Sequence, residues 1–393
     1  MTYSIWGENL FGQVQHEAAY VCSPTLWREC DHLFAANWAQ VIFRRQSLYG
    51  VWAGMLTRLI WGGVENCVDI SDDRSYRPRG AYSQGTPLVR ADDDLDRNKS
   101  GWHRTSHPSR LETKVDLEKT HFLGHDSFLA FHDPSNGKVC SIGCLVEPRR
   151  ADGIDRCVTE QSFESVEMNI HGGLVAVCKE QDSDHYEYRF YPSLPSLLHP
   201  TPVSPSINPP GYHLLSLPSP SFLTQTPTLI SAPTTDHFTL LLSPSQTVLT
   251  FSPSKDNRFG QLGIPPSSSL HNFSWTHVES LDGLYITRLE GAYALTQDRV
   301  LYNVATGDMV DFLDREGEGQ IEGVRINCLA AGSGWAVASD QKGNLWVCTD
   351  GKAPCFGSND TKGHFEKVVS PPLRGRKIDN LLATHSTCYL SHD

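Results

Sequence analysis

The chain has 393 residues, of which 39% are hydrophobic and 20% are charged, and its formal net charge is -12 at pH 7. This length accommodates two or three ordinary domains, or one long all-β domain with a substantial core. The acidic balance weakens any proposal of direct binding to nucleic acid, because such binding needs clustered Lys and Arg.

The 11 cysteines are odd in number, and no Cys-x-x-Cys pair occurs. We therefore expect reduced, mostly buried thiols, with no zinc site and no disulfide framework. The N-terminus lacks the basic and apolar regions of a signal peptide. No apolar run approaches the ~20 residues of a membrane span. We expect a cytoplasmic or nuclear protein, with no contact with a membrane.

In chain order, the residues predict a repeated β-structure rich in turns. A pattern of small residues, a turn and an apolar strand occurs seven times. The seven segments are 34–43, 121–131, 168–177, 230–242, 286–295, 329–338 and 381–390. Asn136-Gly137 and Lys342-Gly343 follow two of the segments and are typical of hairpin turns. A recurring β-hairpin unit of this kind indicates a repeat fold.

Two octets, 7–14 and 256–263, share the pattern Asn-x-Phe-Gly-Gln-(Leu/Val). Since Gly adopts positive φ without strain and Asn tolerates it, each octet predicts a tight corner leaving a strand. The residues that we expect to hold the corners are Gly7, Asn9, Phe11, Gly12 and Gln13 in the first octet, and Asn257, Phe259, Gly260, Gln261 and Gly263 in the second.

Two stretches interrupt the repeats. Residues 65–120 are polar and predict a solvated insertion loop; its Tyr76, Tyr82 and Trp102 are candidate anchors for a partner protein, although a passive loop is the simpler interpretation. Residues 192–233 hold 11 of the 24 prolines and predict a Pro/Ser-rich loop, since proline interrupts sheets. That loop is either a stiff connection or a ligand for an adaptor domain.

The paired corners and the Ala-Ala-Gly strand of 329–338 resemble the repeat of the regulator of chromosome condensation family. The resemblance implies an all-β fold over residues 1–393: one seven-bladed β-propeller, closed by pairing of the N- and C-terminal strands. The degenerate repeats are most similar to the single-domain members, such as the fungal alpha-tubulin suppressor-like group and an animal group linked to a histone-demethylase-like partner.

The sequence contains no convincing catalytic constellation. His125-Asp126 and His132-Asp133 are two His-Asp pairs, but their seven-residue offset places the histidines on opposite faces of a continuous strand. Gly-x-Ser-x-Gly, P-loop and His-Glu-x-x-His patterns do not occur. We therefore expect no enzyme activity, no catalytic residue, no metal and no cofactor.

The functional expectation is a protein-interaction propeller, acting as a scaffold or regulatory subunit, because recognition usually resides on loops held by a rigid frame. The resemblance to the alpha-tubulin suppressor-like group implies work in transfer-RNA modification and diphthamide synthesis, and the other resemblance implies a chromatin-linked complex. The alternative, implied by the founding member of the family, is a guanine-nucleotide exchange factor for a small GTPase. In either case we expect protein partners of unknown identity, no direct nucleic acid, and a monomer or a subunit of a heteromer.

Overall fold

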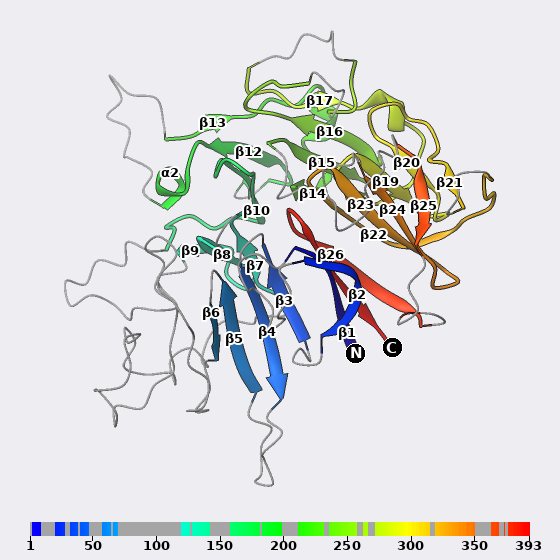
Figure 1. Cartoon of the computed structure of the whole chain (residues 1–393). Helices are drawn as coiled ribbons and strands as arrows, with labels where there is room; N and C mark the ends of the chain where they lie inside the picture. Colours follow the sequence, from blue (N-terminus) through cyan, green and yellow to red (C-terminus); the bar gives the residue numbers. More distant parts are fainter. Residues whose placement is uncertain are drawn as a thin grey trace, which may run out of the picture.

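The computed structural model (Figure 1) describes residues 2–8, 20–27, 32–37, 40–46, 57–63, 66–69, 119–125, 128–141, 158–180, 183–198, 211–231, 236–257, 262–265, 272–314, 319–349, 363–368, 373 and 376–393. Almost all regular structure in these residues is β-strand. The helical elements that they contain are short: α2 (Leu194–Leu198), η2 (Pro220–Phe222) and η3 (Glu279–Leu281).

The described strands form seven sheets, which we number I to VII in chain order. Sheet I contains β26 (Ile378–Ala383), β27 (Thr387–His392), β1 (Thr2–Glu8) and β2 (Tyr20–Trp27). Sheet II contains β3 (His32–Ala36), β4 (Gln40–Gln46), β5 (Thr57–Gly63) and β6 (Asn66–Asp69). Sheet III contains β7 (His121–Leu123), β8 (Ala130–Asp133) and β9 (Lys138–Ser141).

In sheets IV to VII neighbouring strands pair antiparallel, except that β21 of sheet VII pairs parallel with β25. Sheet IV contains β10 (Ser165–Met168), β11 (Leu174–Lys179), β12 (Tyr186–Tyr191) and β13 (His213–Leu214). Sheet V contains β14 (Thr226–Ser231), β15 (Phe238–Ser243), β16 (Thr247–Phe251) and β17 (Thr276–His277). Sheet VI contains β18 (Ile286–Glu290), β19 (Tyr293–Thr296) and β20 (Leu301–Asn303). Sheet VII contains β22 (Ile326–Gly332), β23 (Trp335–Asp340), β24 (Leu345–Thr349), β25 (Phe365–Val368) and the parallel β21 (Phe312–Leu313).

The seven sequence segments predicted as hairpins are confirmed. Each segment includes residues of the first two strands of one sheet, and those strands pair antiparallel in every case. The first strands of several sheets contact one another: β22 contacts β18 and β26, and β10 contacts β14. In these pairs of sheets, which follow one another in the order of the sequence, the first strands therefore lie together.

The two ends of the chain meet in sheet I. β1 lies between β27 and β2, with Thr2 opposite His392 and Gly7 opposite Thr387. Figure 1 shows the N- and C-termini side by side. The His392 ring is fully buried, and its Nε2 lies 2.9 Å from Ser4 Oγ. The predicted pairing of the terminal strands is thus present.

A β-bulge recurs near the start of four first strands, a feature that the sequence did not reveal. The register shifts lie between Leu33 and Ala35, Ile286 and Arg288, Ile326 and Cys328, and Ile378 and Asn380. A bulge leaves one residue outside the ladder and redirects its side chain. In sheet VII that residue is Asn327, whose Nδ2 donates to Ile378 O at 2.9 Å and so joins sheet VII to sheet I.

The two predicted loops need correction where the structure describes them. β6 occupies Asn66–Asp69, inside the proposed 65–120 insertion, because those residues complete the ladder begun by β5. Within 192–233 the chain forms α2, β13, η2 and β14 instead of a continuous loop. β14 tolerates Pro227 because it pairs on one side only, with β15, and a strand edge needs no N–H there.

The core consists of apolar side chains packed between neighbouring sheets. Trp6 of sheet I packs with Trp335 and Val337 of sheet VII. Phe190 of sheet IV packs with Phe251 of sheet V, and the two ring centroids lie 5.5 Å apart at 69°. These neighbouring sheets therefore bury apolar faces against one another, which holds them together.

Candidate functional site

Polar side chains gather where the first strands converge. His121 of β7 and Glu167 of β10 form an ion pair with 3.1 Å between Nε2 and Oε2. The His121 side chain is 47% exposed and the Glu167 side chain 17%. The nearby Glu167 carboxylate raises the pKa of His121, because a negative neighbour favours the imidazolium.

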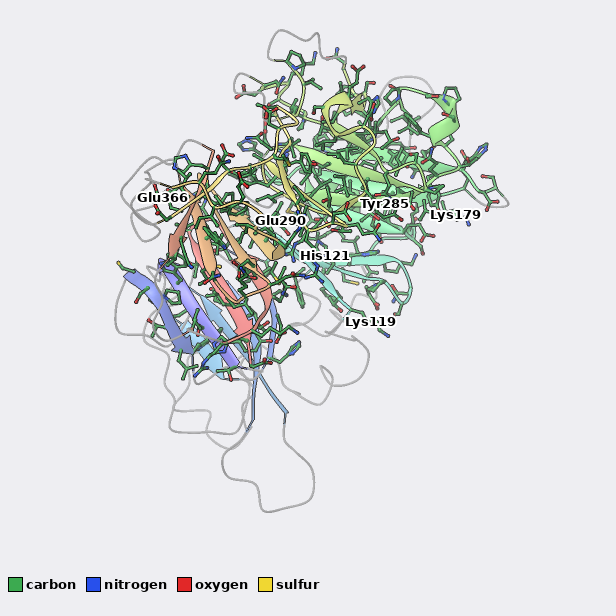
Figure 2. The ribbon with its side chains drawn as sticks, turned by 90° about the vertical axis from the view of Figure 1, so that its right-hand side faces the viewer. Lys119, His121, Lys179, Tyr285, Glu290 and Glu366 are labelled. Atoms are coloured by element: carbon green, nitrogen blue, oxygen red, sulfur yellow. The ribbon has the colours of Figure 1, made fainter. Side chains whose placement is uncertain are left out.

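Arg288 and Glu290 of β18 extend this cluster. Arg288 Nη2 lies 3.0 Å from Glu290 Oε1, and Arg288 also donates to Leu381 O of β26 at 3.2 Å. Burial raises the pKa of Glu290, an effect that the Arg288 cation opposes. Figure 2 shows Glu290 and His121 close together in the view, near the middle of the molecule. The His121–Glu167 pair joins sheets III and IV, and the Arg288 side chain joins sheet VI to sheet I, which are not consecutive in the chain.

The His121–Glu167 pair predicts a pH dependence. Since the folded-state pKa of His121 is raised, its contribution to stability is present below pH ~6.5, the unfolded value. That contribution is lost as the pH rises through the raised folded value. We expect an NMR titration of His121 to give a pKa above ~6.5 that falls in Glu167→Gln. A pKa unchanged by Glu167→Gln would contradict this pairing.

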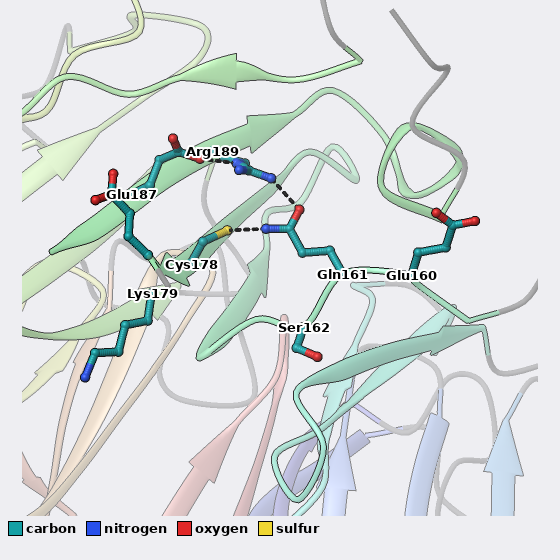
Figure 3. Close-up of a pocket in the computed structure, with 8 residues that line it drawn as sticks. Glu160, Gln161, Ser162, Cys178, Lys179, Glu187 and Arg189 are labelled. Atoms are coloured by element: carbon teal, nitrogen blue, oxygen red, sulfur yellow. Dashed lines mark hydrogen bonds and ion pairs between the residues drawn. The ribbon is translucent and has the colours of Figure 1, made fainter. Parts of the chain in front are cut away.

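A polar cavity of about 560 Å³ lies beside β11 and β12 of sheet IV, against residues 160–162 that precede this sheet. Its lining residues are Glu160, Gln161, Ser162, Cys178, Lys179, Glu180, Glu187 and Arg189. Figure 3 shows Arg189 held between Glu187 and Gln161, to both of which it donates. The guanidinium also lies 4.5 Å from the centre of the Tyr212 ring, so it is fixed by stacking and by hydrogen bonds.

The cavity does not have the chemistry of a thiol enzyme. Burial raises the pKa of the Cys178 thiol to about 11, so the thiol is protonated at neutral pH and a poor nucleophile. Gln161 Nε2 donates to Cys178 Sγ at 3.5 Å. The cavity therefore presents fixed hydrogen-bonding groups, suited to recognition.

The second predicted corner is described in part. Asn257 is buried; its Nδ2 donates to Ile264 O at 3.0 Å and Pro265 O at 3.2 Å, and its Oδ1 accepts from Leu262 N at 3.0 Å. Gly263 has φ +68, where a side chain would meet Val278 and Val304. The Asn257 side chain thus bonds backbone groups of residues 262, 264 and 265, as a corner at this position would require.

Most other predicted site residues lie outside the described residues. Gly7 is described and lies in β1, at a register shift after Ile5. Those outside are Asn9, Phe11, Gly12, Gln13, Phe259, Gly260, Gln261, Tyr76, Tyr82 and Trp102. The corner and partner-binding roles of these residues stay predictions.

Asn257 offers a direct test of the corner. We expect Asn257→Ala to lower the free energy of unfolding by about 2–3 kcal/mol, since it strands buried backbone groups. Urea unfolding followed by tryptophan fluorescence measures the change. Ser254→Ala is the control; it removes an exposed hydroxyl that accepts from Asp256 N at 3.1 Å, so its expected cost is below ~1 kcal/mol. A variant at 257 as stable as the control would contradict the corner role.

Of the two His-Asp pairs considered in the sequence, His132 and Asp133 have structural partners, and Asp126 of the other pair lies outside the described residues. His132 is buried and its Nε2 donates to Phe163 O at 3.0 Å. Asp133 holds the turn before β9 by accepting from Ser135 N at 2.9 Å and from Asn136 Nδ2 at 2.8 Å. Among the described residues, no group of three or more His, Cys, Asp or Glu could hold a metal ion, and no helix has the length and apolarity needed to cross a membrane.

Comparison with solved structures decides the fold. Human WBSCR16 is similar over the whole of both chains, with 10% identity and a TM-score of 0.54. Prp20p from Saccharomyces cerevisiae, studied for its binding to Gsp1p and histones, is similar over all of this chain and 91% of its own, with 12% identity and a TM-score of 0.55. Yeast RCC1 (Prp20) bound to Kap60 gives 12% identity and a TM-score of 0.56, over all of this chain and 88% of its own.

The chain has the fold of the RCC1-type β-propellers. The resemblance seen in the sequence is therefore confirmed at the level of the fold. No family model matches the sequence, and no curated protein is significantly similar to it. Identities this low carry the architecture and not the activity.

The sequence missed the central polar cluster of the propeller. Arg288 and Glu290 lie in a segment recognised only as a strand, and Glu167 precedes the turn of another. The one feature of the sequence that could have indicated the cluster is that these charged residues stand in first strands that are otherwise mostly apolar. That signal becomes informative only when the first strands are known to converge, because a lone charge in a strand usually faces solvent.

Proposed function

We propose that this protein is a non-enzymatic interaction propeller that acts as the scaffold or regulatory subunit of a complex. The observation that carries the proposal is the likeness, over the whole chain, to propellers whose structures are described with protein partners. We also propose that the seven sheets are seven blades of a ring that the β1–β27 pairing closes. Closure removes exposed sheet edges, and such a frame presents its loops rigidly.

Large apolar side chains on described loops support this role. Tyr285, just before β18, is 58% exposed, and Met309, after β20, is 66% exposed. Aromatic and Met side chains are enriched in interfaces. A rigid frame that displays them suits partner binding better than chemistry on a small substrate. Complexes of transfer-RNA modification, diphthamide synthesis and chromatin, in the cytoplasm or nucleus, are the first candidates.

The proposal is tested by the size of the native complex. The protein is tagged at its own locus, and the cell extract is compared with the purified recombinant chain by sedimentation velocity. We expect the native protein to sediment faster and to co-purify with a fixed set of proteins at constant ratio. Sedimentation as a monomer in both samples, with no constant companion after cross-linking, would overturn the proposal.

The exchange-factor alternative draws on the likeness to Prp20p, which was studied for its binding to Gsp1p. Nucleotide release from a panel of small GTPases loaded with a fluorescent nucleotide separates the two functions. A scaffold leaves the release rate at its intrinsic value. Acceleration that rises with the concentration of this protein would establish exchange instead.

A further inference from the structure

We propose that loops at one face of sheets VI, VII and I form a docking surface for an acidic segment of a partner protein. We call it the basic loop surface. Its residues are Tyr285, Arg299, Arg325, Lys342, Arg376 and Lys377, and all six are exposed. This inference rests on the proposed function, for which it names the chemistry of the partner.

The backbone brings the sheet VI and sheet VII parts together. Arg299, in the turn between β19 and β20, accepts at its carbonyl from Ile326 N at 2.9 Å. Arg325, just before β22, accepts from Gln341 N at 3.0 Å, beside Lys342 in the turn between β23 and β24. Three cations from separate loops are therefore neighbours through two backbone hydrogen bonds.

The remaining residues continue the surface on both sides. A Cβ on Gly343 would lie 2.6 Å from Arg376 O, so the loop entering sheet I touches the turn that carries Lys342. Lys377 accepts from Asp393 N at 3.3 Å. At the other end, Tyr285 accepts from Gln297 N at 2.8 Å, which places this tyrosine beside the turn of Arg299.

The five cationic side chains differ in whether they already contact a negatively charged group. Arg299 Nη1 donates to Asn327 Oδ1 at 2.8 Å, and Arg376 Nη1 lies 3.3 Å from His392 Nδ1, both groups without a negative charge of their own. Lys377 Nζ lies 3.4 Å from Asp379 Oδ1. The Arg325 and Lys342 side chains make no hydrogen bond or ion pair with other described residues. Four of the five cations are thus available to an incoming carboxylate.

The local composition favours an acidic protein segment over a nucleic acid. Asp298, Asp379 and Asp393 lie among the cations, and they would repel a continuous phosphate backbone. A peptide places its carboxylates at separate points and can pass between them. The exposed Tyr285 ring provides an apolar contact of the kind that anchors protein interfaces. Five exposed cations in one region of a chain with net charge -12 also create a local field that attracts such a segment.

The test uses the full chain and a fluorescein-labelled oligopeptide of alternating Glu and Asp. Binding is followed by fluorescence anisotropy at several salt concentrations, with a labelled duplex oligonucleotide as the comparison. The test variant is Arg325→Glu/Lys342→Glu, since neither side chain supports another described residue. The matched control is Lys119→Glu/Lys255→Glu, which changes the net charge equally at other exposed parts of the surface.

We expect the wild type and the control to bind the peptide equally, with binding weakened by salt, and the test variant to bind at least about tenfold more weakly. Equal binding by the test variant, no binding by the wild type, or tighter binding of the duplex would overturn the proposal. The test variant is also carried through the native-complex purification. If the test variant still co-purifies with the same proteins, this surface is not the docking surface, but the proposed function stands. If the wild type co-purifies with no constant set of proteins, the proposed function itself is contradicted.

Discussion

Gly332→Ala should destabilise the protein by about 3 kcal/mol, because a rigid ring already occupies the space that its methyl group needs. An added Cβ would lie 2.1 Å from Trp335 Cε2. The ring cannot move freely, since Trp335 Nε1 donates to His385 O at 2.9 Å and the ring is buried. Displacing it would break the contact between the hairpins of sheets VII and I.

Urea unfolding followed by fluorescence measures this effect. Gly319→Ala is the control, since its added Cβ would approach only the Asp314 side chain, at 3.3 Å, and we expect a change within ~0.5 kcal/mol. In a protein that already carries Trp335→Leu, Gly332→Ala should lower the free energy of unfolding by at least ~1 kcal/mol less than it does in the wild type, since the two side chains are in direct contact. Equal costs in both backgrounds would show that the glycine is needed for another reason.

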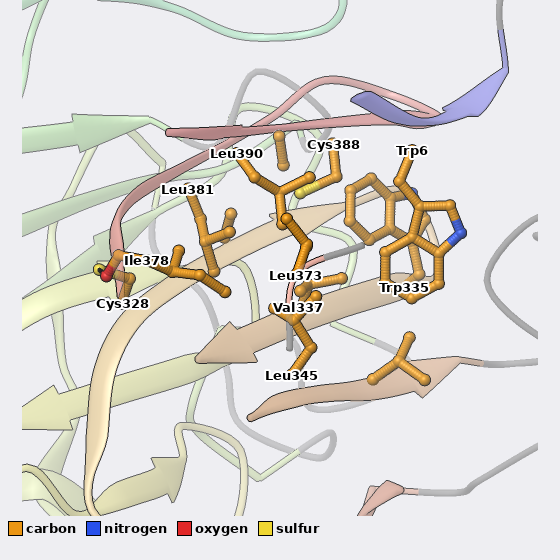
Figure 4. Packing of buried hydrophobic residues seen from close by; sticks show 13 residues of the cluster. Trp6, Cys328, Trp335, Val337, Leu345, Leu373, Ile378, Leu381, Cys388 and Leu390 are labelled. Atoms are coloured by element: carbon orange, nitrogen blue, oxygen red, sulfur yellow. Dashed lines mark hydrogen bonds between the residues drawn. The ribbon is translucent and has the colours of Figure 1, made fainter. Parts of the chain in front are cut away.

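Trp6→Ala should cost about 3–5 kcal/mol, the range for removing a large buried aromatic side chain. Trp6 is 3% exposed, and Figure 4 shows its ring beside Trp335, in a cluster shared by sheets I and VII. Its strand, β1, is also the one that pairs with β27. Trp6→Ala therefore removes packing that holds together the sheet in which the two ends of the chain pair.

The denaturation midpoint of Trp6→Ala is compared with that of Leu26→Ala, whose side chain in the neighbouring β2 is 38% exposed. We expect the Leu26 variant to change stability by less than ~1 kcal/mol. Trp6→Phe should recover part of the loss, since it retains much of the buried area. If Trp6→Ala unfolded at the midpoint of the Leu26 variant, the terminal strands would not be essential to the frame.

The hairpins could be predicted because their information is local. Runs such as 329–338 combine small residues, a turn and apolar residues within a few positions, and each became the first two strands of a sheet. The boundaries in proline-rich or polar stretches could not be predicted in this way. Thr226–Ser231 forms β14 in spite of Pro227 because β15 supplies a ladder on one side only, a fact about neighbours and not about composition.

The candidate sites likewise divide into those that the sequence could predict and those that it could not. The corner residue Asn257 was recognisable from a repeated motif, and the fold shows which backbone groups its side chain bonds. The central cluster and the basic loop surface each combine residues from at least two sheets, and the cavity beside Arg189 combines sheet IV with residues 160–162 that precede it. Their members are ordinary charged residues in the sequence, because nothing local distinguishes a solvated charge from one that faces another strand.

By itself, the sequence determined that this chain is a β-repeat protein with seven hairpin units, since alternation, turn residues and Gly positions act over short distances. The two corners stay predictions. The resemblance to the repeat family predicted that the terminal strands pair, as β1 and β27 do. Only the tertiary structure decided which units are neighbours and which charges meet. Those outcomes depend on contacts between residues far apart in the chain, such as Ser4 with His392, and such contacts exist only once the sheets have packed.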